Sequence, residues 1–136
     1  MNRKYLLIMQ ILFMSMIFQS CDSGRHIDKT QWHALMGANG EEFFLLTKEQ
    51  QQEKLKILKL CLENTQVAGD SLVFSCTRSD FIEQGLPGEY YDFCLSDIQD
   101  INNFPSWTAE LKQEFLSSYN ASRDSSLQKV KALMDD

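Results

Sequence analysis

The stretch TKEQQQEKLKILKLCLEN, residues 47–64, decides the fold class of this chain. Leu55, Leu58 and Leu62 recur at helical spacing, and the charged and amide side chains around them supply a polar face. Thr47 is followed three residues later by Gln50, a capping-box pattern that marks the first turn of a helix. The segment is therefore predicted to be an amphipathic helix whose apolar face other elements must cover.

Apolar runs flank this helix on both sides. Residues 43–46 and residues 72–74 carry large apolar side chains, and residues 67–70 have the composition of a turn. The second run is predicted to be a short strand. The first run is its candidate partner in a small β element.

The C-terminal half is predicted to be helical, with breaks. Thr77 or Ser79 can cap a brief helix that ends at Gly85, and Pro87 suits the first turn of the next helix. Residues 106–134 form either one long helix or two, because a stretch rich in Ser and Asn interrupts their apolar pattern. The predicted fold is mainly α, a small domain of about four helices. A minor two-stranded element would make it α+β, and an all-α bundle is the simpler alternative.

The beginning of the chain is typical of a cleaved export signal. Arg3 and Lys4 give it a basic opening, and a mainly apolar run follows from residue 6 to residue 18. That run is shorter than the ~20 residues that a helix needs to span a bilayer. Ser20 is the kind of small residue found at a cleavage site.

The cleavage region also carries a resemblance to a known family. Phe18-Gln19-Ser20-Cys21 resembles the lipobox of bacterial lipoproteins, in which a cysteine follows an apolar residue and then small residues. The resemblance covers residues 1–21 only. It implies that Cys21 becomes the lipidated N-terminus of a cell-envelope protein, held on a membrane by acyl chains such as palmitate. It leaves open which membrane and which face carry the protein.

These observations divide the chain into three parts. Residues 1–20 are interpreted as the signal peptide, residues 21–40 as a lipidated tether, and residues 41–136 as a single helical domain. The 136 − 20 = 116 residues that remain after cleavage are enough for one domain. Trp32 and Leu35 are the large apolar residues of the tether, and Trp32 either docks on the domain or is disordered.

The cysteines and histidines offer little chemistry. Besides Cys21, the chain has Cys61, Cys76 and Cys94, which allow one disulfide in any of three pairings and leave one thiol over. No C-x-x-C spacing indicates a redox or zinc site, and at least one of these thiols is expected to be a buried apolar residue. Both histidines lie in the presumed tether. We expect no metal, no cofactor and no catalytic residue.

The most suggestive feature is an acidic block interleaved with aromatic residues. Residues 79–114 contain eight carboxylates and one base, Lys112, a net charge of 1 − 8 = −7. Acidic surfaces with Tyr and Trp anchors are suited to a basic protein partner. The alternative is that the aromatic residues are core and the acids give solubility. The candidate partner-binding residues are Tyr90, Tyr91, Asp92, Asp97, Asp100 and Trp107.

Charge also limits the class of partner. Without Arg3 and Lys4 the mature chain carries 11 − 19 = −8, which argues against nucleic acid and against anionic lipid head groups. The sequence thus predicts a non-enzymatic envelope lipoprotein that is an interaction protein or accessory subunit of an assembly. Its alternatives are a membrane-tethered inhibitor or immunity protein and, with less support, a hydrolase of wall or glycan. Asp70-Ser71-Leu72 also matches the O-glycosylation pattern of some bacterial envelope proteins, with Ser71 as the acceptor.

Overall fold

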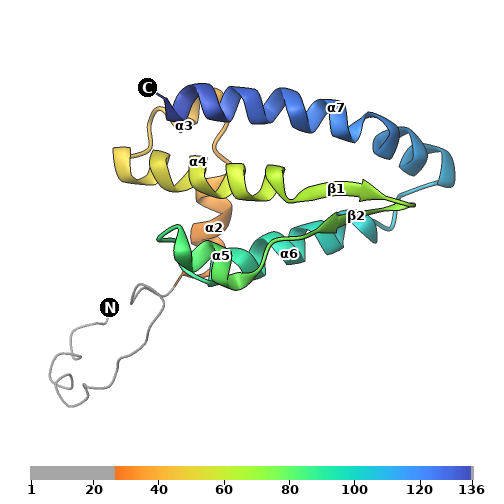
Figure 1. The fold of residues 1–136 in the computed structure, drawn as a ribbon, viewed down its shortest axis with the longest axis horizontal. Coiled ribbons are helices and arrows are strands. Elements are labelled where there is room, and N and C mark those ends of the chain that lie inside the picture. Colours follow the sequence, from red (N-terminus) through yellow and green to blue (C-terminus); the bar gives the residue numbers. More distant parts are fainter. Residues whose placement is uncertain (1–26, 136) are drawn as a thin grey trace, which may run out of the picture.

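The computed structural model describes residues 27–135, and the domain they form is mainly helical with one small antiparallel hairpin (Figure 1). This confirms the predicted fold class. Within the described residues there are six helices, of which four have eight residues or more. The elements are α2 (Lys29–Met36), α3 (Gly40–Phe43), α4 (Lys48–Glu63), β1 (Thr65–Ala68), β2 (Ser71–Phe74), α5 (Arg78–Glu83), α6 (Glu89–Asn102) and α7 (Ala109–Met134).

Threonines cap three of the helices, α4, α5 and α7. Thr47 and Gln50 form the predicted capping box of α4, in which the Gln50 N–H donates to the Thr47 hydroxyl over 3.1 Å. Thr77 caps α5 in the same way, as predicted, and Thr108 caps α7. Residues 109–134 form one helix, which decides between the two alternatives for this segment.

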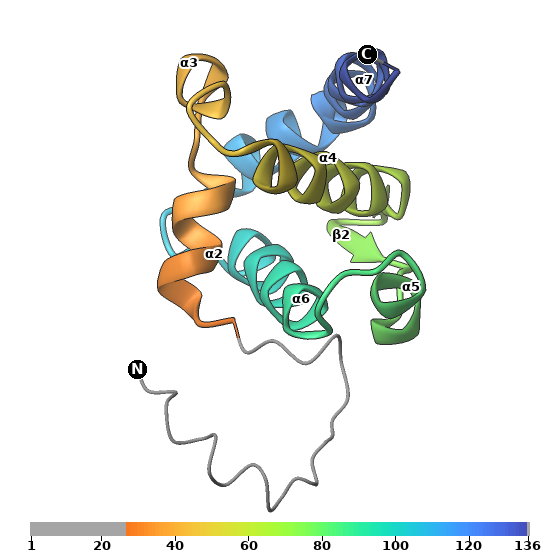
Figure 2. The same cartoon turned by 90° about the vertical axis from the view of Figure 1, so that its left-hand side faces the viewer.

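The elements form two helical arms on either side of the hairpin. α7 runs alongside α4 on one side of the hairpin, and α6 lies on the other side against β2 (Figure 1). α2 crosses the ends of this arrangement and contacts both α4 and α6 (Figure 2). α6 and α7 therefore share few direct contacts and are held together by the elements between them.

The strand pairing differs from the prediction. β2 is formed where a strand was expected, but its partner is β1, with Thr65 opposite Phe74 and Ala68 opposite Ser71. Residues 43–46, the expected partner, form the end of the short helix α3 and the turn after it instead of a strand. The turn is confined to Gly69 and Asp70, because Gly69 takes a φ of +66° that allows the chain to reverse within two residues. The predicted turn thus began two residues too early.

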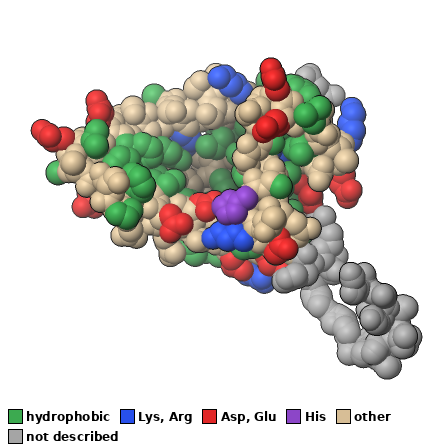
Figure 3. All heavy atoms as spheres, turned by 180° about the vertical axis from the view of Figure 1, so that it is seen from behind, with side chains coloured by type: hydrophobic (Ala, Val, Ile, Leu, Met, Phe, Trp, Pro, Cys, Tyr) green, Lys and Arg blue, Asp and Glu red, His purple; other side chains and the backbone are tan. Residues whose placement is uncertain are grey.

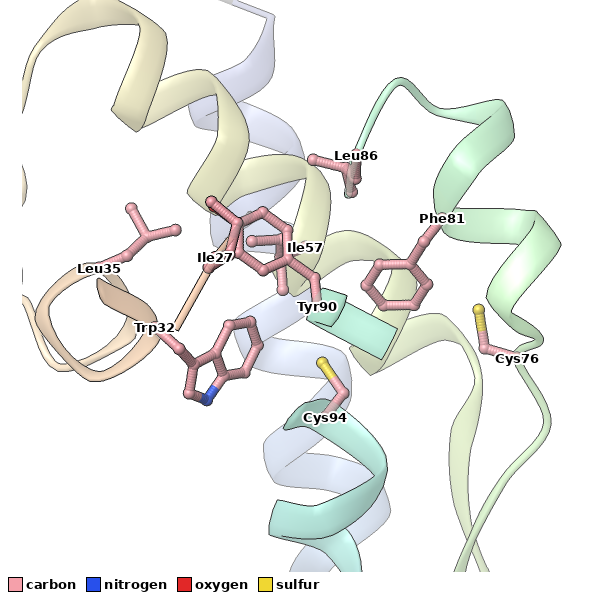
Figure 4. Packing of buried hydrophobic residues seen from close by; sticks show 9 residues of the cluster. All are labelled: Ile27, Trp32, Leu35, Ile57, Cys76, Phe81, Leu86, Tyr90 and Cys94. Carbon is pink, nitrogen blue, oxygen red and sulfur yellow. The ribbon is translucent and has the colours of Figure 1, made fainter. Parts of the chain in front are cut away.

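The segment interpreted as tether up to residue 40 is largely part of the fold, so that boundary was wrong. Ile27, Trp32 and Leu35 are buried in the largest core cluster, and only 2% of Trp32 is exposed (Figure 4). Asp28 and Gln31 form a capping box that starts α2. The short helix α2 is stable because its apolar residues pack against α4 and α6.

Two smaller clusters complete the core. Phe43, Leu55 and Val130 join α3, α4 and α7, whereas Leu72, Ile98 and Leu116 join the hairpin to α6 and α7.

The predicted export signal and Cys21 lie outside the described residues. No helix between residues 27 and 135 is both long enough and apolar enough to cross a membrane.

Candidate functional site

An apolar groove lies between α6 and α7 on the face seen in Figure 3, where hydrophobic side chains surround a hollow. It consists of two adjoining hollows that meet at Ile101. The inner hollow, about 160 Å³, is walled by α2, α4, β2, α6 and α7. The outer hollow, about 320 Å³, is lined by Asp100, Ile101, Phe104, Trp107 and Phe115. We call the two together the α6–α7 groove.

Aromatic rings form one wall of the outer hollow. The Trp107 ring lies 5.5 Å from that of Phe104 and 5.3 Å from that of Phe115, which in turn lies 5.9 Å from Tyr119. The indole N–H of Trp107 donates to the carbonyl of Ile101 over 2.6 Å. Because its polar edge is satisfied, Trp107 is held in one orientation and offers the groove an apolar surface.

The outer hollow is exposed to solvent. Half of the Phe104 side chain and 37% of Ile101 are accessible, although both are large and apolar. Neighbouring exposed apolar side chains that line a concavity mark a binding surface more often than single exposed ones do.

The inner hollow is fixed by a bond between distant segments. Asp97 accepts a 3.1 Å hydrogen bond from the indole N–H of Trp32, 65 residues earlier in the chain. This bond holds α2 against α6 and places a half-buried carboxylate at the wall of an otherwise apolar space. Asp97 therefore both positions Trp32 and gives this part of the groove its negative charge.

Two thiols of the described residues, those of Cys76 and Cys94, are buried and have raised pKa values. Cys61 and Cys94 line the inner hollow, and all three thiols of the described residues are free. A hydrogen bond with Cys61, together with burial, raises the pKa of the Cys94 thiol. Burial, with the nearby carboxylate of Asp80, raises the pKa of Cys76 to about 12. The expectation that at least one of these cysteines is a buried apolar residue is confirmed for Cys76 and Cys94.

The α6 side of the groove is acidic. Among the described residues, neither Asp97 nor Asp100 forms an ion pair. Two cations of α7 make other contacts, since Lys112 donates to the carbonyl of Asn102 and Arg123 donates to that of Thr65. The carboxylates of this rim thus remain available to a cationic group from outside.

The structure divides the six predicted partner-binding residues into two sets. Asp97, Asp100 and Trp107 line the α6–α7 groove. The other three lie elsewhere on α6. Tyr90 is buried in the core, 5.5 Å from the Trp32 ring, and Tyr91 is half-buried and stacked on Phe74. Asp92 is exposed beside Arg78, whose guanidinium is 3.7 Å from its carboxylate. Tyr90 and Tyr91 are thus core or near-core residues, as the alternative interpretation of the aromatic residues has it.

Sequence reasoning missed Ile101, Phe104 and Phe115 as groove residues. A signal was present, because Phe104 and Trp107 are two aromatic residues in a connection too short to bury both.

A separate hollow, about 440 Å³, lies outside the α6–α7 groove, between α2 and the start of α4. Its lining is more polar and includes Gln31, Glu49, Gln50 and Glu53. Within residues 27–135 no group of three His, Cys, Asp or Glu side chains is arranged to hold a metal ion. Comparison of the chain with protein-family models, curated proteins and solved structures found no match.

Proposed function

We propose that this chain is a lipid-anchored envelope protein that binds another protein in the α6–α7 groove and catalyses no reaction itself. The observation that carries the proposal is the outer hollow, where the fixed Trp107 indole and the exposed Ile101 and Phe104 form an apolar concavity. Rigid aromatic side chains lose little conformational entropy on binding, which suits them as interface anchors.

The chemistry of the groove indicates the kind of partner. Its floor is suited to one or two large apolar side chains, and Asp97 and Asp100 on its rim are suited to Lys or Arg nearby. An amphipathic helix with basic flanks has both features, because it presents apolar residues at helical spacing along one face. A basic amphipathic segment of another envelope protein is therefore the proposed occupant.

The anchor is the second part of the proposal. Its support is the lipobox-like sequence that ends at Cys21, together with the basic and apolar stretches before it. A lipid on Cys21 would confine the groove to the surface of a membrane and raise its encounter rate with partners there.

Photo-crosslinking in intact cells tests the groove directly. A benzophenone-bearing phenylalanine replaces Phe104 in the groove or, as matched control, Ile82 on α5, which is 42% exposed. We expect a crosslinked partner from position 104 only, and its crosslinked peptide should combine apolar and basic residues. Equal crosslinking from both positions, or none from position 104, would contradict the proposal.

Charge reversal separates the acidic rim from the apolar floor. In the crosslinking experiment, Asp100→Lys should lower the yield at position 104 several-fold, because it places a cation beside the basic partner. Glu83→Lys on α5 makes the same change in charge away from the groove and should leave the yield unchanged. Mass spectrometry of the N-terminal peptide tests the anchor separately, by the presence of acyl chains on Cys21.

A further inference from the structure

The loop between α3 and α4 carries two neighbouring apolar side chains in solvent. Leu45 is 84% exposed and Phe44 is 66% exposed, more than any other large apolar side chain in the described part of the chain. Their neighbours Phe43 and Leu46 are packed against the core. The exposure is therefore confined to the two residues at the tip of the loop.

The loop is held in this conformation by specific contacts. The side-chain amide of Gln51 donates to the carbonyls of Phe43 and Leu46, each over 3.2 Å, and so fixes the backbone on both sides of the tip. The ring of Phe44 lies edge-on to buried Phe43, 5.2 Å away. Asn39 caps α3 just before the loop. The two apolar side chains project from a constrained turn, which the rest of the fold does not cover.

The length of chain between the proposed lipid and the domain limits where this loop can be. Five residues separate Cys21 from Ile27, which is already 93% buried because only 7% of it is exposed. Six extended steps reach about 20 Å at most. α7 alone, with 26 residues, is about 39 Å long, so the domain cannot be held clear of the bilayer by more than half its length.

The end of the molecule that carries the tether is also the end that carries the loop. α2, α3 and the start of α4 all face the viewer in Figure 2. Ile27, where the described chain begins, and Leu46, beside the exposed tip, line the same hollow. A domain held to a bilayer by an N-terminal lipid therefore turns this end toward the bilayer.

We infer that Phe44 and Leu45 insert into the interfacial region of the membrane and form a second, non-covalent contact beside the lipid on Cys21. The inference rests on the proposed lipid anchor. Apolar side chains are favourable at the boundary between head groups and acyl chains, and a tethered domain needs only a small contact to fix its orientation. Glu41 and Glu42 flank the loop, so the contact fits a zwitterionic surface better than an anionic one. With this end on the membrane, the far end of the domain, where α6 connects to α7, points away from it.

Depth-dependent fluorescence quenching tests the contact in the full-length lipidated protein. The protein with Leu45→Trp is reconstituted into phosphatidylcholine vesicles whose acyl chains are brominated near the head group. Leu111→Trp, at a side chain 50% exposed in the first turn of α7, is the matched control at the opposite end. The unmodified protein gives the background from Trp32 and Trp107. We expect the added signal at position 45 to be quenched by at least half and that at position 111 to be quenched little.

The outcomes separate the contact from the anchor. Equal quenching at both positions, in protein that floats with the vesicles and carries acyl chains on Cys21, would overturn the membrane contact alone. A purified protein without acyl chains on Cys21 would overturn the anchor and the contact together. In lipidated protein, Phe44→Ser combined with Leu45→Ser should increase protease cleavage of the α3–α4 loop on vesicles several-fold, whereas unchanged cleavage would count against the contact.

Discussion

Lys54 is the one charged side chain that is buried among the described residues. Its ammonium group donates to the carbonyls of Ala38 and Met36, at and just beyond the C-terminal end of α2. A cation in this position satisfies carbonyls that the helix leaves without partners and complements the helix dipole. Burial lowers the pKa of Lys54 from its usual 10.5, and nearby Glu42 partly opposes that effect.

Replacement of Lys54 should therefore have a pH-dependent cost. Lys54→Met is expected to lower the free energy of unfolding by about 1–2 kcal/mol at pH 7, because it leaves carbonyls unsatisfied. A lysine whose pKa is lowered by folding binds fewer protons in the folded state, so its contribution to stability rises as pH increases toward 10.5. Urea unfolding at pH 7 and pH 10 should show a larger difference between the two proteins at pH 10. Lys48→Met, at an exposed position in the first turn of α4, should change stability by less than about 0.5 kcal/mol. A difference that shrinks with pH would contradict this assignment.

The thiols offer a second prediction at this scale. A pKa raised from 9.0 to about 12 lowers the thiolate fraction of Cys76 at pH 8 about a thousandfold, and Cys94 is shifted in the same direction. We expect iodoacetamide to alkylate half-buried Cys61 at least about a hundredfold faster than Cys76 or Cys94 in the native protein. Peptide mapping by mass spectrometry measures the three rates. We expect similar rates only in denaturant. Similar rates in the native protein would show that Cys76 and Cys94 are not buried.

At the scale of elements, one side chain joins α6 to the hairpin. Asn102 accepts from the Leu72 N–H over 2.8 Å and donates to the Leu72 carbonyl over 2.9 Å, as a neighbouring strand would. Asn102→Ala is expected to reduce the free energy of unfolding by about 2 kcal/mol, because both backbone groups of buried Leu72 lose their partner. Asn103→Ala removes a single bond to the Gln99 carbonyl within the same helix and should cost less than about 0.5 kcal/mol. Comparable losses in thermal or urea unfolding would contradict the bridging role.

Elements were predictable from sequence where their signals are local. Thr47 was identified as a cap, and Thr77 as one of two candidates with Ser79, because a capping box involves only residues three apart. α2 has the same signal in Asp28 and Gln31, but its few apolar residues gave no reason to expect a partner for it. β1 was missed because Gln66 and Ala68 have weak strand preference. Its pairing with β2 and its packing on α7 stabilise it, and both contacts are non-local.

At the scale of the molecule, the boundary of the folding unit can be tested by truncation. A chain that begins at Ile27 retains every buried residue of the main core cluster, whereas one that begins at Glu41 loses Ile27, Trp32 and Leu35. We expect cooperative thermal unfolding from the first and none from the second, because loss of a buried Trp alone costs about 3–5 kcal/mol, a large share of a small domain's stability. Circular dichroism and calorimetry measure the transition. Equal cooperativity in the two proteins would show that residues 27–40 are not part of the folding unit, as the predicted tether boundary implies.

The candidate site was only partly predictable for a related reason. Composition singled out an acidic and aromatic region that contains Asp97, Asp100 and Trp107, all of which line the groove. It could not separate them from Tyr90 and Tyr91, because helical periodicity shows which residues share a face and not which neighbour covers that face. The groove exists because α6 and α7 pack mainly on other elements and share few contacts with each other.

The bond between Trp32 and Asp97 has a consequence for the order in which the chain folds. The two residues are 65 positions apart, and ribosomes add about 5–20 residues per second. α2 is thus synthesised about 3–13 s before the helix that completes its packing exists. During this interval Trp32 and Leu35 are exposed on the nascent chain, where a holding chaperone can bind them. The first helix of the described residues to be made is thus among the last to reach its final position.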